Sequence, residues 1–219
     1  MKNPFKTLKG TIIFSLILML IIPLIIVSII VSGTIVKELS DTLKEENDVI
    51  TREISIYAES FFHKHEELLS TISSYYIENP NFQTESALES ISKIYKTVEL
   101  VLILDSDGKV RFTSDQNRTK IGFDMSRQSF FGGAMNTHGY FWSLPFIDPV
   151  TGETTLTISK KFDDFIIAGY VVVKDFTDFL KALEYDIASI AIVDNSGNII
   201  AHSDPARAIR RENINDDNY

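Results

Sequence analysis

The 219-residue chain contains no cysteine. Disulfides and thiolate metal sites are therefore excluded. Catalytic patterns are missing as well, because there is neither a G-x-S-x-G nucleophile elbow nor an H-E-x-x-H zinc motif, and the glycine pair of "FFGG" is not followed by the Lys-Ser/Thr of a phosphate loop. His138 and His202 have no partner at metal-ligand spacing. We expect no enzymatic activity, no catalytic residue, no metal and no cofactor.

Positive charge is scarce over most of the chain, whose formal net charge is −9. Lys2, Lys6 and Lys9 precede residue 11, and the remainder holds 18 basic against 30 acidic residues, a net of about −12. Like charges repel, so an acidic domain is a poor partner for nucleic acid or for anionic lipid headgroups. We expect no nucleic-acid partner.

Charge is absent altogether from "TIIFSLILMLIIPLIIVSIIVS", residues 11–32. At about 1.5 Å per residue this segment is long enough to cross a hydrocarbon core of about 30 Å. A signal peptide would have an apolar core of about 7–15 residues and a small-residue cleavage site, which "SGTIVKELS" matches poorly. We predict a cytoplasmic N-terminus over residues 1–10 and an uncleaved transmembrane helix over 11–33, since the lysines precede it. The rest of the chain would then lie outside a bacterial inner (cell) membrane.

Glycine is absent from residues 34–79, and proline does not recur until Pro80. Apolar residues follow a helical stripe through this segment: Ile35, Leu39, Leu43, Ile50, Ile54, Tyr57, Phe61, Leu68, Ile72 and Tyr75. We predict a stalk helix over residues 34–79, roughly 60 Å long. Its stripe must pack either on the domain downstream or on the same helix of a second chain, which would make the protein a homodimer. His63 and His65 point in different directions, so we expect them on a solvated face and not at a shared metal.

Beyond residue 80 the apolar pattern changes to that of strands. A short helix over about 86–96 precedes strands at 98–104 and 109–113, joined by the turn "DSDG". A connecting helix or irregular loop follows in "IGFDMSRQSFFGGAMN". Three more strands are expected in "GYFWSLPF", "TTLTISKKF" and "FIIAGYVVVKDF", and then a helix over 176–188. The order predicts an α+β fold with a five-stranded antiparallel sheet and flanking helices.

The first hairpin is repeated near the end of the chain. "VLILDSDGKVRFTSD" (residues 101–115) and "IAIVDNSGNIIAHSD" (190–204) share two aspartates, a glycine and a serine at matching positions. The second copy is followed by fifteen residues without a further apolar run. We therefore predict an incomplete second domain whose hairpin has an open sheet edge or a mobile tail and low hydrogen-exchange protection.

These motifs and their order resemble the double Cache domain, the PAS-like periplasmic sensor of bacterial chemoreceptors, sensor histidine kinases and diguanylate cyclases. The resemblance lies in "LILDSDGKVRFTS", "IGFDMSRQSFF", "WSLPFIDPVTGETTLTISKKF" and "AGYVVVKDF". It implies a membrane-distal PAS-like ligand-binding domain over residues 80–184 and the start of a truncated membrane-proximal one over 185–219. In this family the distal domain binds small molecules between the sheet and the connecting segment.

The amino-acid-binding members of the family carry an Arg-x-aromatic-aromatic motif in that segment. Here Gln128 stands at the arginine position, Phe130 and Phe131 fill the aromatic positions, and Arg127 lies one residue early. A guanidinium clamps a carboxylate with two charge-assisted hydrogen bonds, which a neutral amide cannot do. Either Arg127 has taken over this role, or the ligand lacks an α-carboxylate.

Asp148 and Asp175 match the acidic positions of the family. Such a pair would bind an ammonium group, which makes an amine-bearing molecule a candidate ligand. Asp148 is equally suited to the turn before Pro149, and Asp175 to capping the next helix. Tyr140 and Trp142 share one face of a strand and form either an aromatic wall for the ligand or part of the core. The predicted ligand-binding residues are Arg127, Gln128, Phe130, Tyr140, Trp142, Asp148 and Asp175.

The function predicted from the sequence is extracytoplasmic sensing of a small organic molecule. The chain would be the N-terminal part of a bacterial transmembrane receptor that acts in chemotaxis or in two-component or cyclic-dinucleotide signalling. The alternative is a membrane-tethered interaction or scaffolding module whose filled core leaves no pocket. An open cavity flanked by Asp148 and Asp175 would favour sensing, and one filled by aromatic side chains would favour the alternative.

Overall fold

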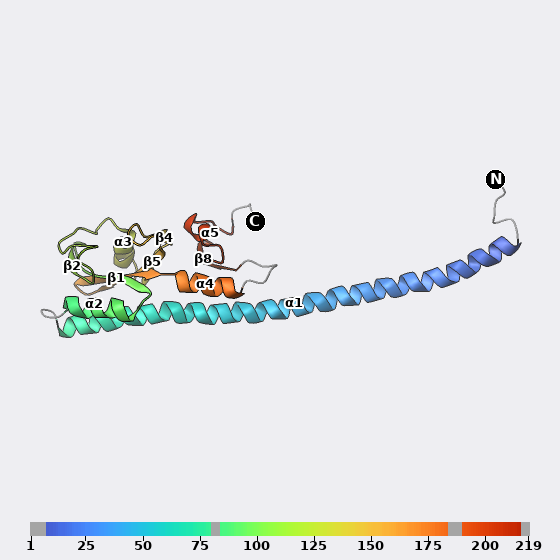
Figure 1. Cartoon of the computed structure of the whole chain (residues 1–219), viewed down its shortest axis with the longest axis horizontal. Helices are drawn as coiled ribbons and strands as arrows, with labels where there is room; N and C mark the ends of the chain where they lie inside the picture. Colours follow the sequence, from blue (N-terminus) through green and yellow to red (C-terminus); the bar gives the residue numbers. More distant parts are fainter. Residues whose placement is uncertain (1–7, 80–83, 184–189, 216–219) are drawn as a thin grey trace. The chain divides into compact units, whose positions relative to one another are not determined.

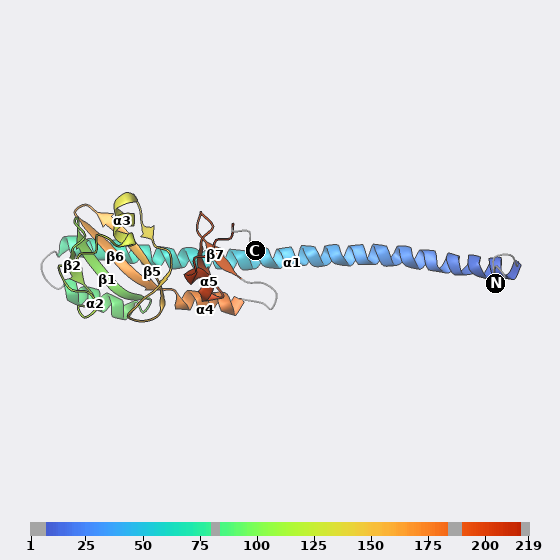
Figure 2. The ribbon, with the colours of Figure 1, turned by 90° about the horizontal axis from the view of Figure 1, so that it is seen from above.

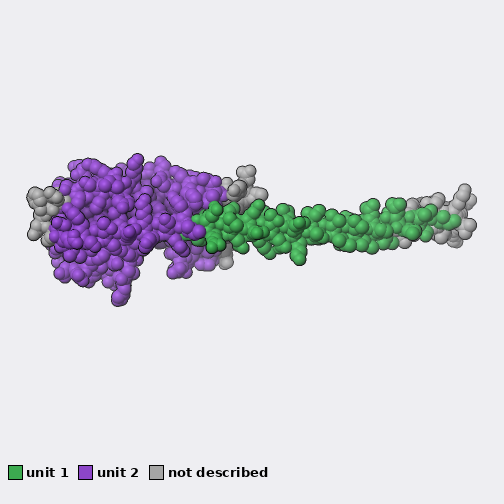
Figure 3. All heavy atoms as spheres, turned by 90° about the horizontal axis from the view of Figure 1, so that it is seen from below, with its two compact units in different colours: residues 1–55 green, residues 56–219 purple. Residues whose placement is uncertain are grey.

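The computed structural model describes residues 8–79, 84–183 and 190–215. It has two compact units, residues 1–55 and 56–219, which Figure 3 colours separately. Helix α1 (Leu8–Glu78) supplies the first unit and continues into the second. The predicted transmembrane and stalk segments are therefore consecutive parts of one helix, which contains Pro23.

Among the described residues, one helix is long and apolar enough to cross a membrane. Its most apolar window has a mean hydropathy of 2.7 and lies near the N-terminus. No residue of that window is buried in the protein, unlike the core helix of a globular domain. A signal sequence near the N-terminus can also meet these criteria, so length and composition make α1 a candidate membrane span and no more.

The second unit is built on an antiparallel sheet with the order β2-β1-β6-β5-β3, and β4 also pairs with β5. The strands are β1 (Val98–Asp105), β2 (Val110–Thr113), β3 (Phe141–Trp142), β4 (Phe146–Ile147), β5 (Thr154–Phe162) and β6 (Phe165–Val172). The predicted antiparallel α+β architecture is confirmed, but with six strands in place of five. The extra strand arises in "GYFWSLPF", because Pro145 has no N–H for the ladder and separates β3 from β4.

Helices cover both faces of this sheet. Figure 1 shows α3 (Ser129–Asn136) on the opposite side from α2 (Thr84–Ile94) and from the C-terminal part of α1, and Figure 2 gives the view at right angles. Alternate residues of β1, such as Leu100 and Leu102, form a buried core with Phe130 and Ala134 of α3. On the other face, α1 buries a stripe formed by Leu68, Leu69, Ile72 and Tyr76. The alternation along each strand thus separates the two helical layers.

Helix α4 (Lys174–Leu183) follows β6 and packs on α1 through aromatic rings. Phe176 stacks on Tyr57 and Phe61, with ring centroids 5.5 and 5.1 Å apart. The sequence predicts a helix over 176–188; α4 begins two residues earlier, and residues 184–189 lie outside the described part of the chain.

The predicted C-terminal hairpin is present as a separate two-stranded sheet, β7 (Ala191–Val193) with β8 (Ile199–His202), followed by α5 (Pro205–Ile209). Its turn has the same aspartate hydrogen bonds as the turn between β1 and β2. Asp105 Oδ1 accepts the N–H groups of residues 107 and 109, and Asp194 Oδ1 accepts those of residues 196 and 198. Gly108 and Gly197 have φ values of 85° and 84°, a region that favours glycine. The low hydrogen-exchange protection expected for this hairpin stays a prediction.

The repeat also extends beyond the hairpin, at the same separation of 89 positions along the sequence. The N–H of Val110 donates to Phe123 O at 2.9 Å, and that of Ile199 donates to Glu212 O at 2.9 Å. The N–H of residue 125 donates to Gly108 O, just as that of residue 214 donates to Gly197 O. The matched stretches, 122–126 and 211–215, share no residue type at equivalent positions. The chain therefore begins the same backbone structure twice.

Candidate functional site

The candidate site centres on Arg118, which lies in the loop after β2. Its Nη1 is 3.2 Å from Glu99 Oε2 of β1, and its Nη2 pairs with Asp148 Oδ2. The side chains of Arg118 and Asp148 are only 8% and 1% exposed. Charges buried to this extent are stable only when paired and hydrogen-bonded, so the three side chains form one structural unit.

Asp148 also shapes the turn between β4 and β5. Its Oδ1 accepts the N–H groups of Val150 and Thr151 at 2.8 and 3.3 Å, while Thr151 Oγ1 donates to Glu99 Oε2 at 3.1 Å. This is the turn role that the sequence context allowed for Asp148. Both carboxylate oxygens of Asp148 are therefore engaged by the protein itself.

An aromatic cluster adjoins the ion pairs on the face of the sheet that α3 covers. The Arg118 guanidinium lies 5.3 Å from the ring centroid of Tyr170, whose ring meets those of Phe130 and Phe146 edge-on at 6.1 and 5.9 Å. Ser159 Oγ donates to Phe130 O at 2.7 Å and fixes the first turn of α3 to β5. Burial raises the pKa of the Tyr170 hydroxyl, and the charge of Arg118 acts in the opposite direction. These side chains pack into the space between α3 and the sheet.

Two of the predicted site residues, Phe130 and Asp148, lie in this region. Arg127 and Gln128 are exposed, and Gln128 is the N-cap residue of α3 without a side-chain capping bond. Asp175 is exposed in the first turn of α4. The structure therefore does not bring these three side chains together with Asp148.

Tyr140 and Trp142 point to the other face of the sheet, toward α1. The Tyr140 hydroxyl hydrogen-bonds Ser70 Oγ, and Trp142 Nε1 donates to Glu66 Oε1 at 3.2 Å. Phe141, between them, packs against the core beneath α3. Phe141 therefore faces the side of the sheet on which the site lies, and the two predicted residues, Tyr140 and Trp142, face the other side.

Sequence reasoning missed Arg118, Glu99 and Tyr170. Glu99 and Tyr170 gave a usable signal, because each is a polar side chain inside an apolar strand, in "VELVLILD" and "FIIAGYVV". Arg118 gave none, since it stands among polar residues of a loop. Only the tertiary structure brings this loop to the turn after β4.

The expectation that His65 is solvated is wrong. His63 is exposed, but His65 is 1% exposed, because it lies four residues after Phe61 and three before Leu68 on the buried stripe of α1. Within the described residues, no group of three His, Asp or Glu side chains is arranged to hold a metal ion.

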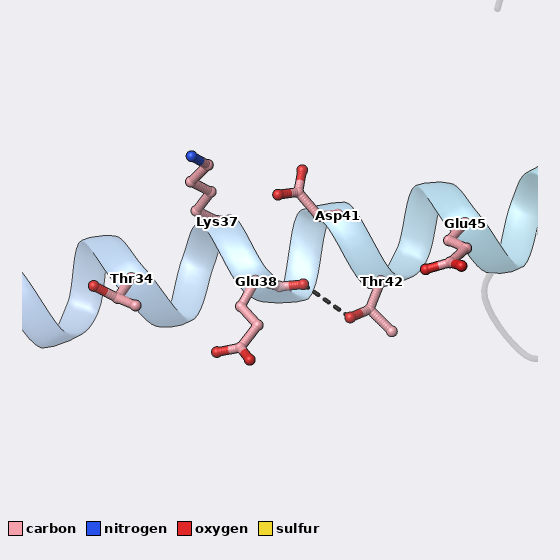
Figure 4. Close-up of a pocket in the computed structure, with 6 residues that line it drawn as sticks. All are labelled: Thr34, Lys37, Glu38, Asp41, Thr42 and Glu45. Carbon is pink, nitrogen blue, oxygen red and sulfur yellow. Dashed lines mark hydrogen bonds between the residues drawn. The ribbon is translucent and has the colours of Figure 1, made fainter.

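A hollow lies on the first unit, along α1 (Figure 4). It is lined by Thr34, Lys37, Glu38, Asp41, Thr42 and Glu45. All six side chains come from one helix, and Thr42 Oγ1 is bonded to the helix itself through Glu38 O at 2.9 Å. A hollow with walls on one helix alone cannot enclose a ligand.

No protein-family model matches the chain, and no curated protein sequence does. Solved structures do match its fold. The ligand-binding domain of the Pseudomonas fluorescens chemoreceptor CtaA, in complex with L-isoleucine, has a TM-score of 0.57 at 20% identity, over 72% of this chain and 67% of that one. The corresponding domain of the Campylobacter jejuni chemoreceptor Tlp3, in complex with L-norvaline, has a TM-score of 0.57 at 16% identity, over 75% and 70%.

A third match is an extracellular domain assigned to a histidine kinase, rpHK1S-Z16, with a TM-score of 0.53 at 19% identity, over 67% of this chain and 64% of that one. At these identities the likeness concerns the fold. It confirms the long N-terminal helix followed by an antiparallel sheet that the resemblance predicted. The chain therefore has the Cache-type fold of these receptor ligand-binding domains.

Proposed function

We propose that this chain is the extracytoplasmic sensory region of a membrane-anchored bacterial receptor and that the domain after the stalk binds a small organic molecule. The fold supports this, because the matching domains of CtaA and Tlp3 are ligand-binding domains of chemoreceptors. The apolar part of α1 would anchor the chain as a single span, with the lysine-bearing N-terminus in the cytoplasm. The chain would act by binding and not by catalysis.

The observation that carries the proposed site is the buried group of one guanidinium and two carboxylates at Arg118, Glu99 and Asp148. One negative charge of this group is uncompensated. A ligand ammonium group would pair with Glu99, which is the more exposed carboxylate, while Arg118 keeps Asp148. A ligand carboxylate would instead add a third negative charge. We therefore place an amine-bearing ligand at this cluster, beside the ring of Tyr170.

A screen of thermal unfolding tests this proposal on the full chain in detergent micelles, with a panel of primary amines, amino acids and organic acids. At least one amine should raise the melting temperature. Glu99→Gln removes the charge that would bind the ammonium group and should weaken that binding about tenfold or more, since hydrogen bonds to charged groups contribute about 1.5–3 kcal/mol.

The matched control is Glu153→Gln, which neutralises a more exposed carboxylate near the same turn and should leave binding unchanged. Equal affinity of wild type and Glu99→Gln for the same amine would place the ligand elsewhere. Stabilisation by organic acids alone would contradict the proposed ligand class.

A second candidate function, the tethered interaction module, is favoured by the packing of Phe130, Phe146 and Tyr170 beneath α3. Their rings pack against one another, and Arg118 already neutralises Asp148. If no compound of the panel changes the melting temperature, this function is supported. A compound that raises the melting temperature through an interaction that requires Glu99 would exclude it.

A further inference from the structure

His65 is a buried titratable residue that the proposed ligand site does not use. It lies on α1 where this helix packs on the sheet, and it is hydrogen-bonded through both ring nitrogens. Nδ1 is 2.7 Å from Phe61 O, and Nε2 is 3.0 Å from Thr97 Oγ1. A carbonyl can only accept, so Nδ1 carries the proton and the Thr97 hydroxyl donates to Nε2. The neutral imidazole therefore satisfies both partners.

Thr97 connects this ring to the centre of the sheet. It directly precedes β1, and its carbonyl accepts the N–H of Val172 at the end of β6, at 2.8 Å. His65 thus links α1 with the start of one central strand and with the end of its neighbour. Any change in the ring's hydrogen bonding acts on the packing of α1 against the sheet.

Aromatic rings enclose the imidazole. The ring of Phe61 lies 4.6 Å from it and that of Trp142 lies 6.2 Å away at a steep angle. Phe61 in turn stacks on Phe176 of α4. A positive charge at this position would lose its hydration, and the faces of aromatic rings compensate only part of that loss.

Among the described residues, no acidic side chain of the surrounding elements forms an ion pair with His65. On α1, Lys64 lies over the Tyr95 ring and Glu66 accepts the N–H of Trp142. Lys96 precedes Thr97 and is exposed, as are Lys174 and Asp175 at the start of α4. Burial lowers the pKa of His65, the charge of Lys64 adds to this effect, and the Phe61 carbonyl opposes it.

We propose that His65 is a proton-responsive contact, whose protonation in mildly acidic surroundings loosens the packing of α1 on the sheet. The imidazolium would carry a second N–H directed at Thr97, which must then give up its own donation to the ring. This makes the proton a second stimulus, independent of any ligand at Arg118. Its output is the same helix that continues toward the membrane-spanning segment.

The direction of the pH dependence follows from the lowered pKa. A histidine in the unfolded chain titrates near pH 6.5, and the folded protein takes up the proton only at lower pH. Between these values the unfolded state binds more protons, so the packing loses stability as the pH falls below about 6.5 and is unaffected above it.

Trp142 is the single tryptophan of the chain and lies beside His65, so its fluorescence reports on this contact. We expect the melting temperature of the full chain in detergent micelles to fall as the pH is lowered below about 6.5, and the tryptophan emission to change at the lower pH at which the folded protein takes up the proton. His65→Gln keeps a donor and an acceptor but cannot be protonated, and should abolish both changes. His63→Gln, at the exposed neighbouring histidine, should leave both in place.

Persistence of the transition in His65→Gln, or its absence from the wild type between pH 8 and 5, would overturn the proposal. A second measurement covers the case in which His65→Gln does not fold. In the wild-type chain with labelled histidines, nuclear magnetic resonance should give His65 a titration midpoint below the ordinary histidine value of about 6.5. A midpoint at or above that value would also overturn the proposal.

Discussion

At the scale of single residues, the candidate site depends on Arg118, whose guanidinium joins two carboxylates from separate segments. Asp148 could be found from the sequence because it follows an apolar strand and precedes a proline. Arg118 could not, since nothing in its local sequence distinguishes it from a solvated loop residue. The alternation of residues 140–142 predicts that Tyr140 and Trp142 share a face, and both side chains do bond to α1. The helix that covers this face is determined by the tertiary packing, and the sequence of a single strand does not reveal it.

Arg118→Met should destabilise the second unit by about 3–5 kcal/mol, because it leaves Asp148 charged, buried and without its counter-ion. Urea unfolding followed by tryptophan fluorescence measures this change. Arg111→Met is the control: Arg111 is half-exposed and 4.0 Å from Asp105, so its loss should cost less than about 0.5 kcal/mol. Similar costs for the two variants would show that the buried ion pairs do not hold this part of the fold.

Among the secondary-structure elements, the short strand β3 contacts helices on both faces of the sheet, α3 on one and α1 on the other. Its Phe141 packs beneath α3, while Trp142 is bonded to α1. The existence and type of most elements were predictable, because their apolar spacing is regular. The division of one predicted strand into β3 and β4 was not, since it follows from how Pro145 interrupts the pairing with β5.

Two adjacent glycines of α3 give a matched test of this arrangement. A Cβ at Gly133 would lie 2.2 Å from Cγ of Phe141, whereas a Cβ at Gly132 would meet nothing within 4 Å. Gly133→Ala should therefore cost about 1–3 kcal/mol through overpacking. Gly132→Ala should be neutral or stabilise the helix by up to about 1 kcal/mol. Denaturant unfolding compares them, and equal stabilities would mean that α3 does not pack closely on β3.

At the scale of the whole molecule, the sequence revealed a repeated hairpin but not the full extent of the repeat. The hydrogen bonds extend it to residues 126 and 215, where the two copies have no residue type in common. Backbone geometry is retained there through asparagine and aspartate side chains that accept N–H groups two residues on. Different residues can make such turns, so sequence comparison alone could not find this part.

The predicted homodimer through the stalk has a direct test, because the chain has no native cysteine. Leu43 belongs to the exposed apolar stripe of α1, and Thr42 lies on the polar hollow of Figure 4. Oxidation in native membranes should cross-link Leu43→Cys into a covalent dimer several-fold more than Thr42→Cys, since only the stripe would face the partner. Equal cross-linking, or none, would argue against a parallel stalk dimer.

We propose above that the domain after the stalk binds a small amine-bearing molecule at the Arg118 cluster. Hydrogen exchange of the full chain, recorded with and without each compound of the screening panel, is the most direct test of this binding. An amine should slow exchange in the segments around Glu99, Arg118 and Asp148 while exchange in the exposed stalk stays unchanged. A panel that leaves these segments unaffected, or that protects other parts of the chain alone, would contradict it.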